Sequence, residues 1–342
     1  MSTRVGPFPG DGAAWNAFAA AQEGFTAFHR AELIDVIESV FGHKCHRLAA
    51  LDAEGRVSAV LPLVRVRSPI FGHFLISMPF VSYGGPLGSA EGIAALSAHA
   101  RSLATETRVG LLELRSAVPL PLDWQVSHRK ITVVLPLIAG DSTATFNTLK
   151  SKLRSQVRRP EKAGVTVRFG PDQVDAFYKV FARHMRDLGT PVMPREWFRA
   201  LARAYGEDFW VGCAYLGEEP IACGAGFRWG GEFEITWASA LRAHSAISPN
   251  MALYWGFIAR AAEAGLERFN FGRCTPGSAT HRFKAQWGAV DEPLYWYQGD
   301  DEVESATPTA GSGAFGLASR VWQRLPLAVA SALGPRIVRY IP

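Results

Sequence analysis

Polar side chains suited to proton or group transfer gather between residues 269 and 288, in the segment FNFGRCTPGSATHRFKAQWG. Arg273 ends an expected strand, and Ser278, His281 and Lys284 follow on a Pro-Gly-Ser turn and an expected helix. His281 and Lys284 are three residues apart, so they share one face of that helix. A lysine ammonium can stabilise an oxyanion, and a histidine can take a proton from an attacking amine. We therefore expect Lys284, His281 and Arg273 to be catalytic and Ser278 to bind substrate; the alternative is a surface turn beside an aromatic core pair.

A basic segment, LKSKLRSQVRRPEKAGVTVR, lies in the middle of the chain, and we expect a helix over 148–163. Its cations face a single acid, Glu161; they are Lys150, Lys152, Arg154, Arg158, Arg159, Lys162 and Arg168. Arg154 and Arg158 are four residues apart and lie on one helix face. Such a stripe suits phosphates of coenzyme A, tRNA or lipid headgroups, so we expect Arg154, Arg158 and Arg159 to bind a phosphorylated co-substrate. A solvated linker helix is the alternative.

Two further segments contain candidate substrate contacts. In VSYGGPLGS, Tyr83 precedes Gly84 and Gly85, and glycines allow a backbone to approach a ligand closely. A turn that closes the first lobe explains the same residues equally well. Asn250 begins an expected helix over 249–264 and is a further candidate contact.

The expected strand EFEITWAS places Glu232 and Glu234 on one face and Trp237 on the other, because side chains alternate along a strand. A carboxylate on an inner strand could act as a general base, but a solvated sheet face is favoured for this pair. Trp237 is a candidate substrate contact.

These segments recur in two cycles of the same order: two helices, a hairpin, a strand, a helix and further strands. The fold class is α/β (α+β), with two lobes built on mixed, mostly antiparallel sheets flanked by helices. We predict an N-terminal lobe over 1–140, a C-terminal lobe over 141–298, a linker over 299–315 and a basic amphipathic tail over 316–342.

The tail combines arginines with apolar side chains and is interrupted by Pro326 and Pro335. Its arginines are Arg320, Arg324, Arg336 and Arg339; its apolar residues include Trp322, Leu325, Val329 and Leu333. Such a segment can lie on an anionic membrane surface or pack on its own lobe, and both remain open.

The 342 residues carry a net charge of +5, and 48% are hydrophobic. The N-terminus shows no apolar signal-peptide core, and no apolar run is long enough to span a membrane. We therefore expect a cytoplasmic protein without a membrane span that can work at the inner face of the membrane. The four cysteines lack zinc-ligand spacing, and we expect no metal. Motifs of serine hydrolases, P-loop NTPases, zincins and Rossmann enzymes are missing from the sequence.

Several segments together resemble the FemAB-like and BioF2-like acyltransferases of the GNAT superfamily, of the type found with exosortase/PEP-CTERM systems. They include VFGHKCHRLAALD, ISMPFVSYGGPL, KLRSQVRRPEKAGV, HMRDLGTPVMPREWF, SPNMALYWGFIARAAEAG, FNFGRCTPGSATHRFKAQWGA and the tail from Arg320. Pro160 stands where the family has a helix former, and a proline there disfavours helix in the second half of the basic segment. Phe283 and Lys284 resemble the aromatic-lysine element that the family places near its acceptor.

The resemblance implies tandem GNAT lobes and transfer of an acyl group to an amine of an envelope component or a lipid, such as a long-chain base. It implies no permanently bound cofactor and an acyl thioester such as acyl-CoA as co-substrate. The alternative donor is aminoacyl-tRNA, with a Fem-type activity on an envelope peptide. A second alternative is a non-catalytic GNAT-like binding module. The expected partners are the amine, possible tRNA and a membrane surface reached through 316–342; the oligomeric state stays open.

Overall fold

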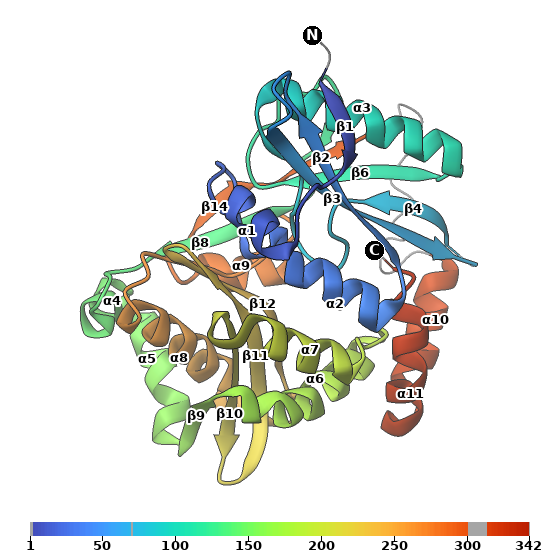
Figure 1. Ribbon diagram of the computed structural model, residues 1–342. Helices are drawn as coiled ribbons and strands as arrows, with labels where there is room; N and C mark the ends of the chain where they lie inside the picture. Colours follow the sequence, from blue (N-terminus) through green and yellow to red (C-terminus); the bar gives the residue numbers. More distant parts are fainter. Residues whose placement is uncertain (1–2, 70, 300–312, 342) are drawn as a thin grey trace. The chain divides into compact units, whose positions relative to one another are not determined.

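The computed structural model describes residues 3–69, 71–299 and 313–341. The chain forms two compact units (Figure 1). The first comprises Met1–Lys130, Pro293–Pro308 and Ile337–Pro342, and the second comprises Ile131–Glu292 and Thr309–Arg336. Each unit is built on one β-sheet, as the two-lobe prediction requires. Most of the predicted linker over 299–315 lies outside the described residues.

The sheet of the first unit has the strand order β1-β2-β3-β4-β6-β15-β7, with β5 paired to β3. Its strands are β1 (Arg4–Pro7), β2 (Lys44–Leu51), β3 (Val57–Ser68), β4 (Gly72–Ile76), β5 (Leu87–Gly88), β6 (Leu111–Ser116), β7 (Gln125–Ser127) and β15 (Tyr295–Gln298). The helices are α1 (Gly12–Ala20), α2 (Ala31–Phe41) and α3 (Ala90–Thr107). The pair β4–β6 is parallel, and the other described pairs in this sheet are antiparallel.

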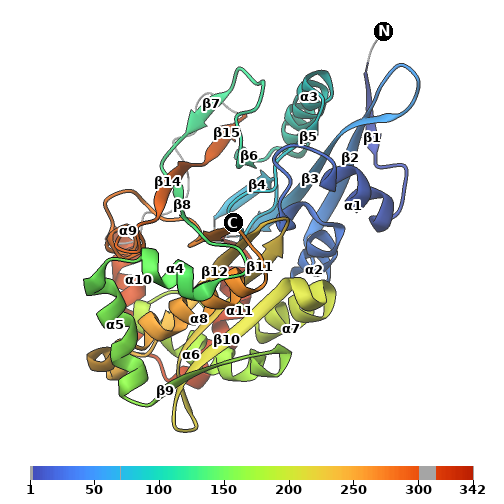
Figure 2. The same ribbon diagram turned by 90° about the vertical axis from the view of Figure 1, so that its left-hand side faces the viewer.

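The sheet of the second unit has the strand order β14-β8-β13-β12-β11-β10-β9. Its strands are β8 (Ile131–Pro136), β9 (Val165–Phe169), β10 (Phe209–Leu216), β11 (Glu219–Trp229), β12 (Glu232–Ala240), β13 (Arg268–Asn270) and β14 (Val290–Pro293). The helices are α4 (Ser142–Thr148), α5 (Ser151–Lys162), α6 (Val174–Leu188), α7 (Arg195–Tyr205), α8 (Pro249–Glu263), α9 (Ala279–Ala285), α10 (Gly313–Gln323) and α11 (Leu327–Val338). The pair β12–β13 is parallel. Helices α4, α5 and α8 lie together beside this sheet (Figure 2).

The two units repeat one topology. The hairpin β2–β3, strand β4, helix α3 and parallel strand β6 correspond to the hairpin β10–β11, strand β12, helix α8 and parallel strand β13. Each parallel pair requires a helical crossover, and α3 and α8 supply it. The predicted repeat and the mixed, mostly antiparallel sheets are confirmed.

The predicted boundary at residues 140 and 141 is corrected by strand pairing. Strand β8 pairs with β13 and therefore belongs to the second unit. Strand β15, which we assigned to the C-terminal lobe, pairs with β6 and β7 of the first. Pairing between segments so distant in sequence leaves no local signal from which a boundary could be drawn.

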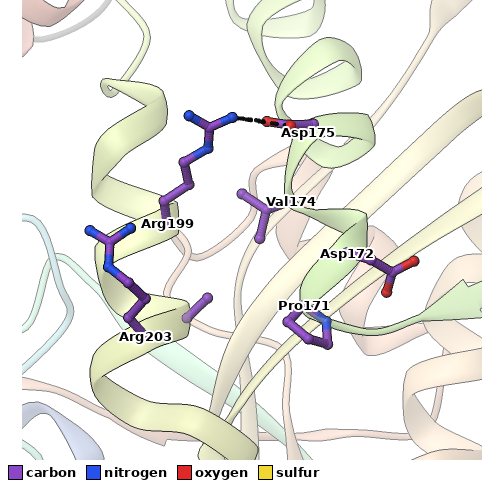
Figure 3. Close-up of a pocket in the computed structure, with 7 residues that line it drawn as sticks. Pro171, Asp172, Val174, Asp175, Arg199 and Arg203 are labelled. Atoms are coloured by element: carbon purple, nitrogen blue, oxygen red, sulfur yellow. Dashed lines mark hydrogen bonds and ion pairs between the residues drawn. The ribbon is translucent and has the colours of Figure 1, made fainter.

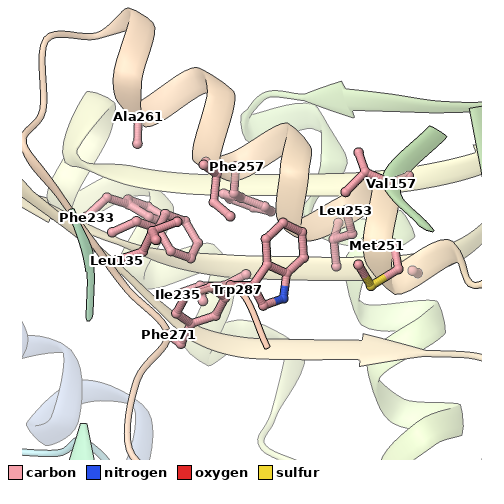
Figure 4. Packing of buried hydrophobic residues seen from close by; sticks show 14 of the residues in the cluster. Leu135, Val157, Phe233, Ile235, Met251, Leu253, Phe257, Ala261, Phe271 and Trp287 are labelled. Carbon is pink, nitrogen blue, oxygen red and sulfur yellow. The ribbon is translucent and has the colours of Figure 1, made fainter. Parts of the chain in front are cut away.

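Aromatic side chains fill the core between α8 and the second sheet (Figure 4). The ring of Phe233 stacks on Trp210, with centroids 4.6 Å apart, and on Phe257 at 5.4 Å. Phe233 and Phe257 are fully buried. Burial of side chains this large stabilises the unit by roughly 2 kcal/mol each, which fixes α8 against β10, β11 and β12.

The basic helix forms, and it continues through Pro160 to Lys162. Leu153, Val157 and Pro160 make its buried stripe against α8. Pro160 cannot donate a backbone hydrogen bond, but only Glu161 and Lys162 follow it in the helix and its ring is buried, so the loss is confined to the last turn. Arg168 is not part of an unopposed stripe, because it forms two hydrogen bonds with Glu218, at 2.8 and 3.0 Å.

The tail forms two helices rather than one interrupted segment. Pro326 lies between α10 and α11, but Pro335 lies inside α11. The guanidinium of Arg186 in α6 donates to the carbonyl of Leu325 at 3.0 Å, and Ala330 of α11 is buried. One face of the tail thus packs on the protein, as the second of the two alternatives requires.

His29 gives the fold a pH dependence that can be measured. The residue is buried, and the Thr26 backbone N–H donates to its Nδ1 at 3.0 Å. Burial lowers the pKa of His29 from 6.5 to about 4. The unfolded chain therefore binds this proton first, so the stability is complete above pH 6.5 and is lost as the pH falls toward 4. The loss expected from this residue is roughly 3 kcal/mol.

Urea denaturation at a series of pH values between 7 and 4 measures this loss. A His29→Gln variant has a lower free energy of unfolding at neutral pH but a shallower decline on acidification. An unchanged slope in that variant would exclude His29 as a source of the pH dependence.

Candidate active site

A β-bulge in β12 sets the geometry of the second sheet near its end. Ala225 of β11 pairs with Trp237, but the next residue, Gly226, pairs with Ile235, so Thr236 is extra. A Cβ on Gly226 would lie 1.9 Å from the Glu234 carbonyl oxygen, so only glycine fits opposite the bulge.

The bulge corrects the predicted orientation of Trp237. Phe227 pairs with Glu234, and its ring also contacts Trp237, with centroids 6.0 Å apart. Trp237 packs on Phe198 of α7 at 5.2 Å. It therefore lies on the same face as Glu234, since an inserted residue reverses the alternation of side chains that follow it.

Strands β12 and β13 pair only over Glu232–Glu234 and Arg268–Asn270, so β12 continues to Ala240 beyond the end of this parallel ladder. A pocket of about 330 Å³ lies at that end of β12. Its lining comes from α6, β12, α8 and α9: His184, Ala238, Ser239, Ala240, Asn250, Leu253, Tyr254, Ala279, Thr280 and Phe283. The predicted contact Asn250 is part of this pocket.

Two polar atoms of the pocket residues are buried without a hydrogen-bond partner in the part of the chain that the structure describes. They are Nδ1 of His184 and Oγ of Ser239. Burial lowers the pKa of His184, so the ring is neutral at pH 7. Buried polar atoms are normally satisfied, and orphaned ones beside a pocket indicate a polar ligand.

Tyr254 adds a phenol to the same pocket. Its ring contacts Phe283 and Phe271, with centroids 5.0 and 5.5 Å apart. Burial raises the pKa of Tyr254, so the hydroxyl keeps its proton and can donate it.

Lys284 is 3% exposed, and its ammonium faces the chain itself. Nζ donates to the carbonyls of Gly272 at 2.5 Å and Arg273 at 3.0 Å. Burial lowers its pKa to about 8, and the nearby carboxylate of the fully buried Glu234 raises it. This arrangement holds the turn after β13 and supports a positioning role; the predicted catalytic role is not tested by it.

The other residues of the predicted cleft are placed as follows. Ser278 is the N-cap of α9, and its Oγ accepts from the His281 N–H at 3.1 Å. His281 uses both ring nitrogens: Gly277 N–H donates to Nδ1 at 3.0 Å, and Nε2 lies 2.9 Å from Asp291. Ser278 and His281 thus flank the pocket-lining pair Ala279–Thr280 without lining the pocket themselves.

The acids of β12 do not form the solvated sheet face that we favoured. Glu234 is fully buried, and the Glu232 side chain is 13% exposed. Glu232 accepts from Arg268 Nε at 2.7 Å and from Asn270 Nδ2 at 2.8 Å. These cross-strand bonds compensate the buried charge and tie β12 to β13.

The turn with Tyr83, Gly84 and Gly85 is buried in the first unit, and Tyr83 is 2% exposed. A Cβ on Gly84 would lie 2.4 Å from Met78 Cγ, and one on Gly85 would lie 2.7 Å from the Arg115 carbonyl oxygen. Close packing therefore requires glycine at both positions, which agrees with the alternative that this segment is a turn closing the first lobe.

The candidate phosphate contacts lie on α5. Arg158 and Arg159 are exposed, and the Arg158 guanidinium lies 5.1 Å from the Phe146 ring centroid. Arg154 is half-buried, and its Nη1 donates to the Asn147 carbonyl at 3.4 Å. The arginines form an exposed basic face opposite the buried stripe of the helix.

A second pocket, of about 300 Å³, lies between α6 and α7 (Figure 3). Arg199 on one wall donates to Asp175 on the other at 2.9 Å. Arg203 pairs with Glu196. Since these charges are compensated within the protein, this pocket offers less for a charged ligand than the one beside β12.

Sequence reasoning missed His184, Ser239 and Tyr254. The glycines of PIACGAGFRW, Gly224 and Gly226, were the available signal, because glycine inside a strand marks a bulge or a close backbone approach. The bulge would have drawn attention to the end of β12. No local sequence pattern links His184 to the end of β12, because the two are far apart in sequence.

A strand that runs past the end of its parallel ladder to a pocket with a neutral histidine and a phenol suits transfer of an activated acyl group. Residues 148–285 match the acetyltransferase (GNAT) domain family, and every residue that lines the pocket lies within this match. The second unit thus contains a GNAT acetyltransferase domain, and the protein is an acyltransferase of this type.

The whole fold has relatives among solved structures. FemX is 13% identical, with a TM-score of 0.65 over 86% of this chain and 97% of its own. The C-terminal domain of a protein described as a lysylphosphatidylglycerol synthetase from Agrobacterium fabrum is 14% identical, with a TM-score of 0.56 over 84% and 92%. A tandem GNAT protein from the clavulanic acid biosynthesis pathway is 13% identical, with a TM-score of 0.51 over 88% and 100%.

These likenesses confirm the tandem GNAT-like fold. No curated protein matches the sequence.

We predict that Lys284→Ala lowers turnover tenfold or more, which corresponds to about 1.4 kcal/mol in the barrier. The variant loses the donor to two carbonyls of the turn after β13, so its melting temperature also falls. Steady-state kinetics and thermal denaturation measure both effects. A folded variant with unchanged kcat and KM would show that Lys284 neither catalyses nor positions the site.

Proposed function

We propose that the protein is an N-acyltransferase that moves an acyl group from an activated donor to an amine, and that the reaction takes place in the pocket beside β12. The observation that carries the proposal is the pair of buried, unpartnered polar atoms there, His184 Nδ1 and Ser239 Oγ. The remaining lining is small or aromatic, which suits the uncharged arm and acyl group of a thioester.

In this reaction the lone pair of the amine attacks the thioester carbonyl, the C–N bond forms and the C–S bond breaks. His184 Nδ1, on a ring that burial keeps neutral at pH 7, accepts the proton that the amine loses. The departing thiolate then takes up this proton from His184, and Tyr254, which burial keeps protonated, donates a hydrogen bond to the sulfur. The products are an amide and a thiol, and Ser239 is placed to orient one of the two reactants.

The favoured donor is an acyl thioester such as acyl-CoA. Beyond Glu234 the strand β12 runs past the end of its ladder with β13, so its backbone edge lies at the pocket, where the amides of a pantetheine arm can bond. The exposed arginines of α5 suit the phosphates of such a donor. The protein needs no resident cofactor for this chemistry, because the donor is already activated.

The proposed acceptor is an amine of a lipid or another envelope component, such as a long-chain base. The name of one structural relative refers to an aminoacylated lipid, lysylphosphatidylglycerol. A place beside an exosortase/PEP-CTERM system, at the inner face of the membrane, is a further part of the proposal and rests on the resemblance of the sequence segments.

Aminoacyl-tRNA is the second candidate donor. The basic face of α5, with Lys152, Arg158, Arg159 and Lys162 exposed against Glu161, favours it, because such a face also suits RNA phosphates. The similarity to the FemX fold fits the same candidate.

His184→Gln is expected to lower kcat by two orders of magnitude or more, with little change in KM, because the variant cannot take up the proton. The kcat of the natural protein falls as His184 becomes protonated below pH 6.5, since burial lowers its pKa from that value. The variant lacks this acid limb. His281→Gln is the matched comparison, because His281 has both ring nitrogens engaged. A loss confined to His281→Gln would transfer the role of base to His281.

Native mass spectrometry and calorimetry with acyl-CoA distinguish the donors. We expect the protein to carry a coenzyme A mass or to bind acyl-CoA, and we expect this binding to weaken in Arg158→Gln/Arg159→Gln. The control is Arg195→Gln, which changes an exposed arginine of α7 that pairs with Asp175, and binding is expected to persist in it. Binding of tRNA that falls steeply with salt, without acyl-CoA binding, would establish the Fem-type donor instead. If the protein turned over neither acyl-CoA nor aminoacyl-tRNA, the result would support a non-catalytic binding module.

A further inference from the structure

The outward faces of α10 and α11 gather exposed apolar side chains. Among the residues that the structure describes, eight large apolar side chains are exposed: Ile138, Leu188, Leu216, Val290, Leu317, Val321, Val329 and Leu333. Four of these lie on α10 and α11, and Leu188 ends α6, against which α10 packs. Leu317 is 66% exposed and Val321 is 57% exposed. Elsewhere such side chains occur singly and need no explanation, but a cluster does.

The opposite faces of the two helices are used for packing. Ser319 Oγ of α10 donates to the Leu188 carbonyl at 3.4 Å. Gly334 of α11 is buried, and a Cβ there would lie 2.8 Å from the Val192 backbone nitrogen. Both helices thus dock on the short segment that ends and follows α6 (Figure 1). Their other faces point away from that segment.

Helical spacing makes each outward face continuous. On α10, Leu317, Val321 and Arg324 are exposed at intervals of four and three residues, with Arg320 beside them. On α11, Val329, Leu333 and Arg336 are exposed at the same intervals. Apolar and cationic side chains therefore share these faces.

The charge of the two helices has one sign. Residues 313–341 contain Arg320, Arg324, Arg336 and Arg339 and no acid. Arg339 is engaged with the carbonyl of Phe41, which leaves three arginines on the outward faces. An apolar stripe flanked only by arginines complements a surface with negative headgroups above hydrocarbon. RNA would use the arginines but not the apolar stripe.

We propose that the outward faces of α10 and α11 form a docking surface for an anionic lipid bilayer. Leu317, Val321, Val329 and Leu333 enter the boundary between headgroups and acyl chains, and the arginines pair with lipid phosphates. At 1.5 Å per residue, each helix is about 18 Å long or shorter, against about 30 Å of hydrocarbon, so it lies in the interface rather than across it. Among the described residues, no helix is long and apolar enough to cross a membrane.

Vesicle co-sedimentation of the full chain tests this proposal. The protein is expected to sediment with vesicles of phosphatidylcholine mixed with phosphatidylglycerol, more weakly with phosphatidylcholine alone, and less at high salt. Leu317→Gln/Val321→Gln and Arg320→Gln/Arg324→Gln are each expected to reduce the binding constant about tenfold or more. The control Leu216→Gln/Val290→Gln removes two exposed apolar side chains elsewhere and leaves binding unchanged.

Circular dichroism and the melting temperature establish that each variant is folded. Equal sedimentation of natural protein and tail variants would overturn the proposal. So would loss of binding only in the arginine variant, because that result shows a charge contact without insertion. The proposal would also fail if the natural protein did not bind the vesicles but formed a dimer, and if Leu317→Gln/Val321→Gln dissociated that dimer. A second copy of the chain would then cover this surface.

Discussion

The extra residue Thr236 reverses which face of the second sheet each later side chain of β12 occupies. Before it, Phe233 and Ile235 pack in the core under α8; after it, Ala238 and Ala240 take that side. Small side chains at the end of β12 leave room for a pocket where larger ones would fill it. The bulge in turn requires Gly226, since any side chain there would meet the Glu234 carbonyl. The pocket, the bulge in β12 and Gly226 therefore depend on one another.

Buried charged side chains hold the turns beside strands in both units. In the second unit, Lys284 caps the carbonyls of Gly272 and Arg273. In the first unit, Arg115 Nε donates to Glu113 at 2.7 Å, and both side chains are 4% exposed. The same guanidinium donates to the Val81 carbonyl at 3.2 Å, which fixes the turn that follows. A buried ion pair adds little net stability over apolar residues, but removal of one partner is costly, so such groups specify one arrangement of the chain.

The tail illustrates how one segment can serve two environments. Ala330 and Gly334 are buried where α11 packs on the protein, whereas Val329 and Leu333 on the same helix are exposed. An ordinary surface helix keeps its apolar side chains on the face toward the core, so exposed ones on the other face need a separate explanation. Packing on the protein and contact with an external apolar phase are therefore compatible, because they use different faces.

The sequence by itself determined the elements and their order. Periodicity and turn residues predicted the two hairpins, the helices after β4 and β12, the basic helix and the repeat, because these signals act over a few residues. Only the tertiary structure decided which strands pair across the chain, and so assigned β8 and β15 to their units. It also decided the site: it buried Lys284, engaged His281 and brought His184 to Ser239 beside Asn250. Burial, hydrogen-bond satisfaction and the reversal of faces at Thr236 depend on neighbours distant in sequence, so local patterns do not encode them.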